Sequence, residues 1–192
     1  MKKGCILCLL ISVISLPLIA QNIIYSNLKE LLAQHGDTTA VLRVEKRSRN
    51  QIVLTGGADY RITAGDDESM CRRLKKRCFA VRDEKGDLYL NCRKLRYKKL
   101  RFGAWYAPAV QLGKNIYFCA MPLGSVIGGN FVEEDDVKLG GNIGDALAAS
   151  SLVTKRVCYE LNGETGKVDF LGKDKMLQLL ENYPELKQAY LK

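Results

Sequence analysis

Apolar and polar residues alternate over much of the chain, with the two-residue period typical of strands that bury one face. Two such runs, at residues 40–45 and 51–55, flank the polar residues 47–50, and we expect them to form a hairpin. Further strands are expected at residues 60–63, 79–82, 88–91, 105–107, 110–112, 116–121, 155–161 and 167–171. Because many of these runs are separated only by short turns, the sequence predicts a largely antiparallel sheet.

Two segments before the middle of the chain have a helical pattern instead. Residues 27–34 read as a short helix, with Asn27 as its N-cap and Glu30 completing a capping box. Residues 66–77 begin with carboxylates and end with basic side chains, which is the order that the helix macrodipole favours. We therefore expect a helix at each place.

The last third of the chain changes in composition. Residues 122–151 are rich in glycine, and we expect a helix or a loop there. Residues 173–181 form an amphipathic pattern, and Pro184 is expected to start another helical turn. The sequence therefore predicts a single α+β domain over residues 21–192, with a C-terminal amphipathic helix packed on the sheet.

The first twenty residues have the pattern of a secretory signal peptide. A short basic stretch precedes an apolar run at residues 5–16, which is too short to span a bilayer comfortably. Ala20 suits the position before a cleavage site, so cleavage is expected between Ala20 and Gln21. An uncleaved N-terminal anchor is the alternative. The pattern predicts an exported protein, periplasmic, outer-membrane-associated or extracellular, with no transmembrane helix after cleavage.

Cysteine usage is consistent with an exported chain but does not define a disulfide framework. Two of the seven cysteines lie within residues 1–20, and the odd number that remains leaves at least one thiol free or paired between molecules. None of the remaining cysteines has the C-x-x-C spacing of a metal knuckle or a redox centre. Several lie inside apolar runs, where cysteine often packs as a small hydrophobic residue.

One cysteine pair follows from the predicted hairpin of residues 79–82 and 88–91. A three-residue loop at 84–86, with Gly86 in the left-handed conformation, places Cys78 directly across from Cys92. The pair falls at a non-hydrogen-bonded position, where side chains approach most closely. Two outcomes stay open at this point, a cross-strand disulfide or two reduced cysteines packed side by side, because disulfide geometry is narrow.

Basic residues are the most conspicuous candidates for binding. The formal net charge is +9, and residues 72–77 and 93–101 are both dense in arginine and lysine. The second segment also holds a tyrosine, and we expect it to form a basic strand face. Its candidate binding residues are Arg93, Lys94, Arg96, Tyr97, Lys98, Lys99 and Arg101. The alternative is a solvated face whose lysines protect an exposed strand edge.

Export changes the partners that such a face would meet. Outside the cytoplasm the abundant polyanions are lipid headgroups, envelope polysaccharides and acidic proteins, all of which attract a basic surface through the same salt-screened field. We therefore expect an anionic envelope surface or an acidic partner protein, with peripheral membrane contact, and no nucleic acid. The acidic cluster at residues 133–136 lacks the ligand spacing of a calcium loop, so no metal is expected there.

Motifs for catalysis are missing from the sequence. His35 is the only histidine, so any mechanism that needs a histidine base depends on it alone. No nucleophile elbow, zinc-binding helix or phosphate-binding glycine loop is present. We expect a non-enzymatic binding protein without cofactor or catalytic residues. A hydrolase with a carboxylate-based site and a structural assembly protein are the alternatives.

Several segments together carry a family resemblance. They are residues 79–82 (FAVR), 88–95 (LYLNCRKL), 155–161 (KRVCYEL) and 173–180 (KDKMLQLL). The chain resembles a family of uncharacterised exported proteins of the Bacteroidota, and the resemblance spans most of the chain after the leader. It implies an extracytoplasmic address and a domain of unknown function, and it transfers no functional residue.

Overall fold

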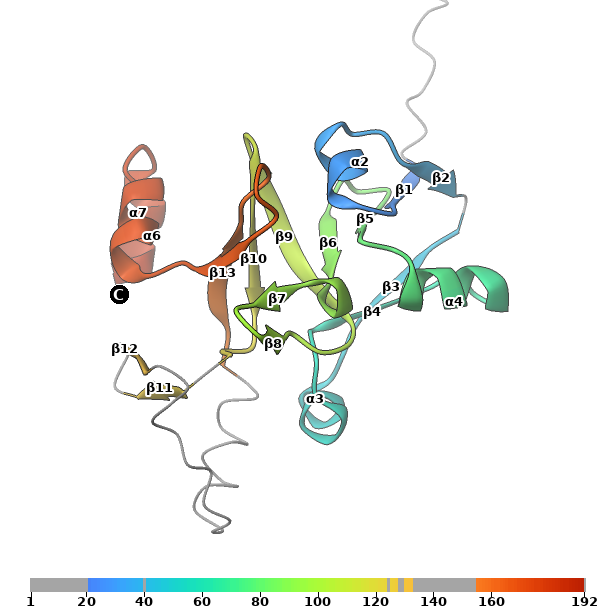
Figure 1. The fold of residues 1–192 in the computed structure, drawn as a ribbon, viewed down its shortest axis with the longest axis horizontal. Helices are drawn as coiled ribbons and strands as arrows, with labels where there is room; N and C mark the ends of the chain where they lie inside the picture. The colour runs from blue at the N-terminus through green and yellow to red at the C-terminus, as the bar shows by residue number, and fades with distance from the viewer. Residues whose placement is uncertain (1–20, 40, 124, 128–129, 133–154, 192) are drawn as a thin grey trace, which may run out of the picture.

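The computed structural model describes residues 21–39, 41–123, 125–127, 130–132 and 155–191 (Figure 1). The predicted signal peptide lies outside the described residues. So do the acidic cluster at residues 133–136 and most of the glycine-rich segment.

A ten-stranded sheet forms the body of the protein, and every pairing in it is antiparallel. The main path runs in the order β14-β13-β10-β9-β6-β5-β1-β2, and β4 joins β3 to β9 at the side. The strands are β1 (Asn22–Tyr25), β2 (Asp37–Thr39), β3 (Arg43–Lys46), β4 (Tyr60–Thr63), β5 (Ala80–Arg82), β6 (Leu88–Asn91), β9 (Tyr106–Leu112), β10 (Asn115–Ala120), β13 (Val157–Leu161) and β14 (Val168–Phe170). Two separate hairpins pair β7 (Arg96–Tyr97) with β8 (Leu100–Arg101), and β11 (Ser125–Ile127) with β12 (Asn130–Val132). The predicted α+β class with a largely antiparallel sheet is confirmed.

The helices are short and lie around the sheet. They are α2 (Leu28–Leu32), α3 (Arg49–Thr55), α4 (Glu68–Lys76), α6 (Lys173–Leu179) and α7 (Pro184–Leu191), with a single 3-10 turn η1 (Cys92–Lys94). The N-cap of α2 is Asn27, as predicted, since its side chain accepts a hydrogen bond from the Glu30 N–H at 3.0 Å. The Glu30 carboxylate accepts from the N–H of Ser26 at 2.7 Å, one residue before the cap. The helix expected at residues 66–77 is also present as α4, capped by Asp67.

The prediction of a hairpin from residues 40–45 and 51–55 is wrong. Its second half is helix α3, which begins at a capping box. The Ser48 side chain accepts from the Gln51 N–H at 3.3 Å, and the Gln51 side chain accepts from the Ser48 N–H at 2.9 Å. These reciprocal bonds satisfy backbone N–H groups that have no partner in the first turn of a helix. They are therefore a signature of a helix start and not of a strand. The strand β3 pairs instead with β4, where Val44 lies opposite Ile62.

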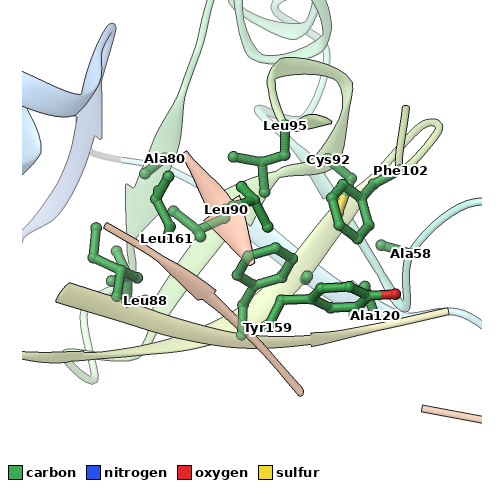
Figure 2. Close-up of a cluster of buried hydrophobic side chains, with 14 of the residues drawn as sticks. Ala58, Ala80, Leu88, Leu90, Cys92, Leu95, Phe102, Ala120, Tyr159 and Leu161 are labelled. Carbon is green, nitrogen blue, oxygen red and sulfur yellow. The ribbon is translucent and has the colours of Figure 1, made fainter. Parts of the chain in front are cut away.

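Two clusters of buried side chains form the core. The larger one centres on Tyr159 of β13, whose ring lies 4.7 Å from the Phe102 ring and 5.5 Å from the Phe118 ring, measured between centroids (Figure 2). The smaller one contains Leu74 of α4 and Val81 of β5. Neighbouring residues of β5 and β6 alternate between the clusters, so the two clusters lie on opposite faces of the sheet.

Helix α4 is held against the sheet at its C-terminal end. The carbonyl oxygen of Leu74 accepts one hydrogen bond from the Asn91 side chain at 3.1 Å and another from the Tyr106 hydroxyl at 2.8 Å. Asn91 also donates to the Cys78 carbonyl at 2.9 Å, and its side-chain oxygen accepts from the Arg93 N–H. A single buried asparagine thus joins α4, the segment between α4 and β5, and η1.

The hairpin of β5 and β6 has the predicted register. Ala80 pairs with Leu90 and Arg82 with Leu88, and Gly86 has a φ of 88° in the turn. The strand ends at Asn91, however, and Cys92 starts the turn η1. Cys78 and Cys92 are both free and fully buried, but they belong to different core clusters. In the structure both thiols are free, and the choice between a cross-strand disulfide and a reduced pair stays a prediction.

The C-terminal helix expected at residues 173–181 is present as α6, and α7 follows it. Figure 1 shows both helices beside β13, on the side away from α4. Lys175 of α6 donates to the Glu160 carboxylate of β13 at 2.7 Å. Tyr117 and Asn115 of β10 donate to the same carboxylate. In the part of the chain that the structure describes, no helix is both long and apolar enough to cross a membrane.

Candidate functional site

A pocket of about 450 Å³ opens beside Trp105, the only tryptophan of the chain. We call it the Trp105 pocket. Its charged lining residues come from four places in the fold, namely β3, β4, α4 with the turn before it, and the turn after β6. They are Arg43, Glu45, Arg61, Asp66, Lys75 and Arg93. The site thus exists only in the folded chain.

Trp105 has an unusual backbone conformation, with a φ of 78°. A positive φ is rare for a bulky residue and points to strong constraint by the surroundings. The carbonyl of Trp105 accepts from the Cys92 N–H, and the carbonyl of Ala104 accepts from the Ala58 N–H, both at 2.9 Å. Gly57 makes this close approach feasible, because a Cβ atom there would lie 2.8 Å from Cδ1 of the indole ring. The ring is therefore locked in place by the segments on either side of it.

Two guanidinium groups flank the indole ring. The Cζ atom of Arg47 lies 5.0 Å from the ring centroid and that of Arg61 lies 5.8 Å from it, both within the range of cation–π attraction. Arg47 is buried and donates to the carbonyls of Gln51, Gly56 and Ala58 and to the Thr55 hydroxyl. Arg61 is exposed. Arg47 therefore has a structural role, while Arg61 presents its charge to the pocket.

The cations outnumber the carboxylates in the Trp105 pocket. The pocket is lined by four basic side chains and two carboxylates, and all four basic side chains are exposed. The basic residues are Arg43, Arg61, Lys75 and Arg93. Among the described residues none of the four forms an ion pair. On paired strands β3 and β4, Glu45 lies opposite Arg61 and Arg43 lies opposite Thr63, so these residues share one face of that hairpin. The pocket therefore has an excess of positive charge available to an anion.

The candidate binding residues at 93–101 do not form a face of the main sheet. They make up η1 and the two-stranded hairpin of β7 and β8, which we call the basic hairpin (residues 93–101). All six basic side chains of this segment are exposed. Tyr97 packs on Tyr159, with ring centroids 5.8 Å apart, and the Lys98 ammonium lies 5.7 Å from the Tyr97 ring. The structure brings only Arg93 of this set into the Trp105 pocket.

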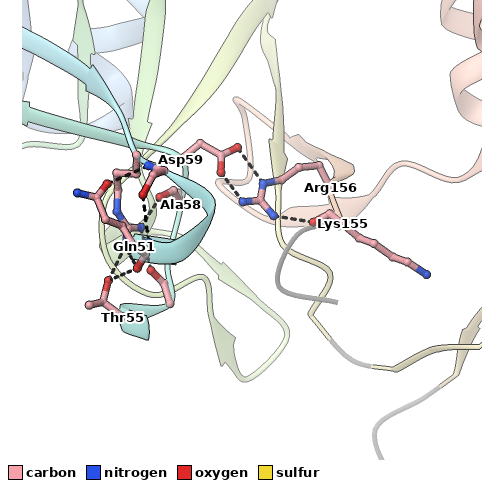
Figure 3. A network of polar contacts seen from close by, with 9 residues as sticks. Gln51, Thr55, Ala58, Asp59, Lys155 and Arg156 are labelled. Carbon is pink, nitrogen blue, oxygen red and sulfur yellow. Dashed lines mark hydrogen bonds and ion pairs between the residues drawn. The ribbon is translucent and has the colours of Figure 1, made fainter. Parts of the chain in front are cut away.

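An ion pair fixes the loop that carries Gly57 and Ala58. Arg156 lies just before β13 and donates two hydrogen bonds to the carboxylate of Asp59. The bond from its Nε atom is 2.8 Å long (Figure 3). Both side chains are mostly buried. A planar, two-point pairing of this kind restricts orientation as well as distance. It therefore ties the β3–β4 connection, which packs against Trp105 through Gly57, to the segment that leads into β13.

Sequence reasoning missed most of the pocket. Arg43 and Arg61 lie on separate strands and are isolated basic residues in the sequence, and Trp105 was expected inside a strand rather than just before β9. The paired glycines at 56–57 were the one local signal of a close backbone approach. His35, the sole histidine, is exposed after α2 and does not line the pocket. No cluster of three metal-binding side chains occurs among the described residues.

The family of the chain follows from comparison with known proteins. The model of a family of unknown function, DUF6563, matches residues 23–192. The chain belongs to this family. The match covers every strand and helix described above apart from the first residue of β1, so the whole fold, including the Trp105 pocket, lies within the family region. No curated protein and no solved structure matches the chain.

Proposed function

We propose that this protein is an exported, non-enzymatic binding protein that contacts an anionic envelope surface or an acidic partner protein. The Trp105 pocket receives the anionic group, and the basic hairpin adds to the positive field next to it. The observation that carries the proposal is the convergence of four exposed, unpaired basic side chains on one pocket.

The chemistry of the pocket favours an oxyanion. Arginine presents a planar fork of donors that fits carboxylate, phosphate and sulfate groups at two points. Arg43 and Arg61 supply such forks, and the half-buried Trp105 ring adds an apolar wall that excludes water from one side. Two lining carboxylates, Glu45 and Asp66, would repel an anion that approaches on their side, which gives the site a preferred orientation.

Export is supported by the pattern of residues 1–20 described above. A basic start, a short apolar run and a small residue before Gln21 are the three parts of a signal peptide. An extracytoplasmic address makes anionic lipids, polysaccharides and acidic proteins the available partners. N-terminal sequencing of the protein recovered from the growth medium or the envelope fraction should begin at Gln21, and recovery of Met1 would contradict cleavage.

Substitution of the two strand arginines tests the pocket directly. We expect the double variant Arg43→Gln/Arg61→Gln to bind phosphatidylglycerol vesicles or the acidic polysaccharide polygalacturonate at least tenfold more weakly than the wild type. A charge-assisted hydrogen bond contributes about 1.5 kcal/mol, and about 1.4 kcal/mol corresponds to a factor of ten. Binding is measured by co-sedimentation, and fluorescence of Trp105 provides a second signal from within the site.

The matched control is Lys85→Gln/Lys167→Gln, which removes the same charge from two exposed positions outside the pocket. This control should bind like the wild type. Equal losses in the two double variants would show that net charge alone matters, and the Trp105 pocket would lose its role. Wild-type protein that binds neither probe at low salt would end the proposal.

A hydrolase with a carboxylate-based site is the second candidate, because Glu45 and Asp66 line the same concave pocket. Two carboxylates on a sugar or ester bond are sufficient for acid–base catalysis. Chromogenic glycosides and esters distinguish the two proposals. Turnover by the wild type that Glu45→Gln and Asp66→Asn each abolish would establish the hydrolase, and absence of any turnover would remove it.

A further inference from the structure

Two cysteines lie opposite each other on neighbouring strands away from the Trp105 pocket. Cys119 of β10 pairs in register with Cys158 of β13. Their Sγ atoms are 3.1 Å apart, and both cysteines are free. Each lies inside an apolar run, where cysteine often packs as a small hydrophobic residue, and the two are far apart in sequence.

The backbone hydrogen bonds show which kind of pair this is. The carbonyl of Cys158 accepts from the Leu171 N–H at 2.9 Å, so the polar backbone groups of Cys158 point toward the chain after β14 and away from β10. Cys119 and Cys158 are therefore a non-hydrogen-bonded pair. At such positions the Cα atoms of antiparallel strands are about 4.5 Å apart, which lies within the range that a disulfide needs.

The pair is also accessible from solvent. Both side chains are only partly buried, and both line an open groove of about 640 Å³ between the sheet and helices α6 and α7. The rest of the groove wall is mostly apolar, with contributions from Pro108, Val110, Leu112, Met176, Leu180 and Leu186. Cys78 and Cys92, in contrast, are fully buried in the core. A small reagent can therefore reach Cys119 and Cys158 without unfolding the protein.

We propose that Cys119 and Cys158 form an oxidisable dithiol site, which a low-molecular-weight disulfide converts into a cross-strand disulfide. The Cys119 thiolate attacks one sulfur of the reagent, forms a mixed disulfide and releases one thiolate. The Cys158 thiol then loses its proton and attacks the Cys119 sulfur, which releases the second thiolate. The protein loses two electrons and two protons, and the reagent disulfide gains them as two thiols.

The electrostatics of the pair agree with this order of attack. The hydrogen bond shared by the two sulfur atoms lowers the pKa of Cys119 to about 7 and raises the pKa of Cys158. Burial raises the pKa of Cys78 to about 11 and that of Cys92 to about 12. At neutral pH the nucleophilic thiolate is thus expected at Cys119, while the core thiols stay protonated.

Oxidation of the folded full chain tests the site. Reduced protein is treated with oxidised glutathione at pH 7, quenched with acid, alkylated and digested, and the linked peptides are identified by mass spectrometry. We expect one internal disulfide, between Cys119 and Cys158, and no modification of Cys78 or Cys92. An internal disulfide at other positions, or a wild type that stops at a glutathione adduct, would overturn the proposal.

Single serine variants separate the two roles. Cys158→Ser should accumulate a glutathione adduct on Cys119, because the second step is blocked, whereas Cys119→Ser should react far more slowly. The control Cys71→Ser, which changes a cysteine outside the pair, should form the disulfide like the wild type. Loss of the disulfide in Cys71→Ser, or equal adduct formation in both pair variants, would contradict the assignment.

A pH profile gives a readout that a merely buried thiol would not show. The rate of iodoacetamide labelling at Cys119 should rise with pH as the thiol ionises and reach half its plateau near pH 7. For an ordinary cysteine the midpoint lies near 8.5. A midpoint at Cys119 at or above 8.5 would remove the kinetic preference for this thiol as the attacking group.

Discussion

Trp105 keeps its left-handed backbone because Gly57 lies against it. The missing side chain at Gly57 leaves room for the indole ring and for the carbonyl of Ala104, and the two segments exchange a hydrogen bond through Ala58. The guanidinium of the buried Arg47 also lies 5.0 Å from the centroid of the ring. The orientation of one aromatic side chain thus depends on a glycine, a buried cation and the backbone of a distant loop.

Gly57→Ala should be strongly destabilising, with a loss of about 2–3 kcal/mol in the free energy of unfolding. The new methyl group would overlap the Trp105 ring, and alanine would have to adopt the positive φ of Gly57. The two free-energy costs add. Chemical denaturation followed by Trp105 fluorescence measures the loss. The matched control is Gly86→Ala, where φ is 88° but no atom lies within 4 Å of the added carbon. It should lose only about 1 kcal/mol, and equal losses would show that the close approach to Trp105 contributes nothing.

Helix α4 is attached to the sheet through one carbonyl group near its C-terminal end. Its amphipathic pattern places Leu74 toward the core and five basic residues of the segment 72–77 toward its C-terminal half. The attachment itself depends on Asn91 and Tyr106, which both donate to Leu74. Those two residues lie on β6 and β9, so the helix cannot be detached without exposing polar groups of two strands.

Asn91→Ala is expected to lower the free energy of unfolding by about 2–4 kcal/mol. It removes three hydrogen bonds of a buried side chain and leaves the Cys78 carbonyl without that donor. Tyr106→Phe, in which the Leu74 carbonyl keeps its bond to Asn91, should lose only about 1 kcal/mol. Urea denaturation of both variants measures the difference. A larger loss for Tyr106→Phe would show that the hydroxyl is the main attachment of α4.

Local patterns predicted the elements that depend on near neighbours. The strand at residues 60–63 and the register of the β5–β6 hairpin were both correct, because alternation and turn chemistry specify them within a few residues. Helix α3 was missed, since a short apolar run at residues 51–55 suits a strand as well as a helix. The Ser48–Gln51 capping box was the signal that distinguishes them.

The candidate site was less accessible to sequence reasoning than the elements were. Arg93 and Lys75 belong to the two dense basic segments of the sequence. Arg43 and Arg61 are isolated in sequence and reach the pocket through the pairing of β3 with β4. The Cys119–Cys158 pair likewise arises from the pairing of β10 with β13 across a long connection. Which distant strands pair depends on the packing of the whole sheet. The local alternation of apolar and polar residues does not specify these partners.

Positive charge is a property of the whole molecule as well as of its pocket. The chain has thirty basic and twenty-one acidic residues, and all six basic side chains of the basic hairpin are exposed. A surface of this kind attracts anions over roughly 10 Å at an ionic strength of 0.1 M. Attraction by the basic hairpin should therefore speed the encounter with an anionic partner, and the Trp105 pocket should set which group is held.

Charge reversal in the basic hairpin tests this division. Lys98→Glu/Lys99→Glu/Arg101→Glu should weaken binding to phosphatidylglycerol vesicles several-fold and make it less sensitive to salt. The control Lys29→Glu/Lys85→Glu/Lys167→Glu changes the net charge equally at exposed sites elsewhere. It should retain most of the binding and its salt dependence. Unchanged binding after reversal of the basic hairpin, over a titration from 20 to about 300 mM salt, would exclude that hairpin from the interface.

The pairing of β10 with β13 has a further consequence for engineering. Ala120 lies opposite Val157, so the chain leaves β10 and enters β13 at adjacent positions of the sheet. Each doubling of the length of such a connection costs only about 0.6 kcal/mol in closure entropy. Arg156 holds the returning end through Asp59 independently of that length. A foreign peptide inserted between β10 and β13 should therefore leave the strand order unchanged, because the pairing of Ala120 with Val157 does not depend on the length of chain between them.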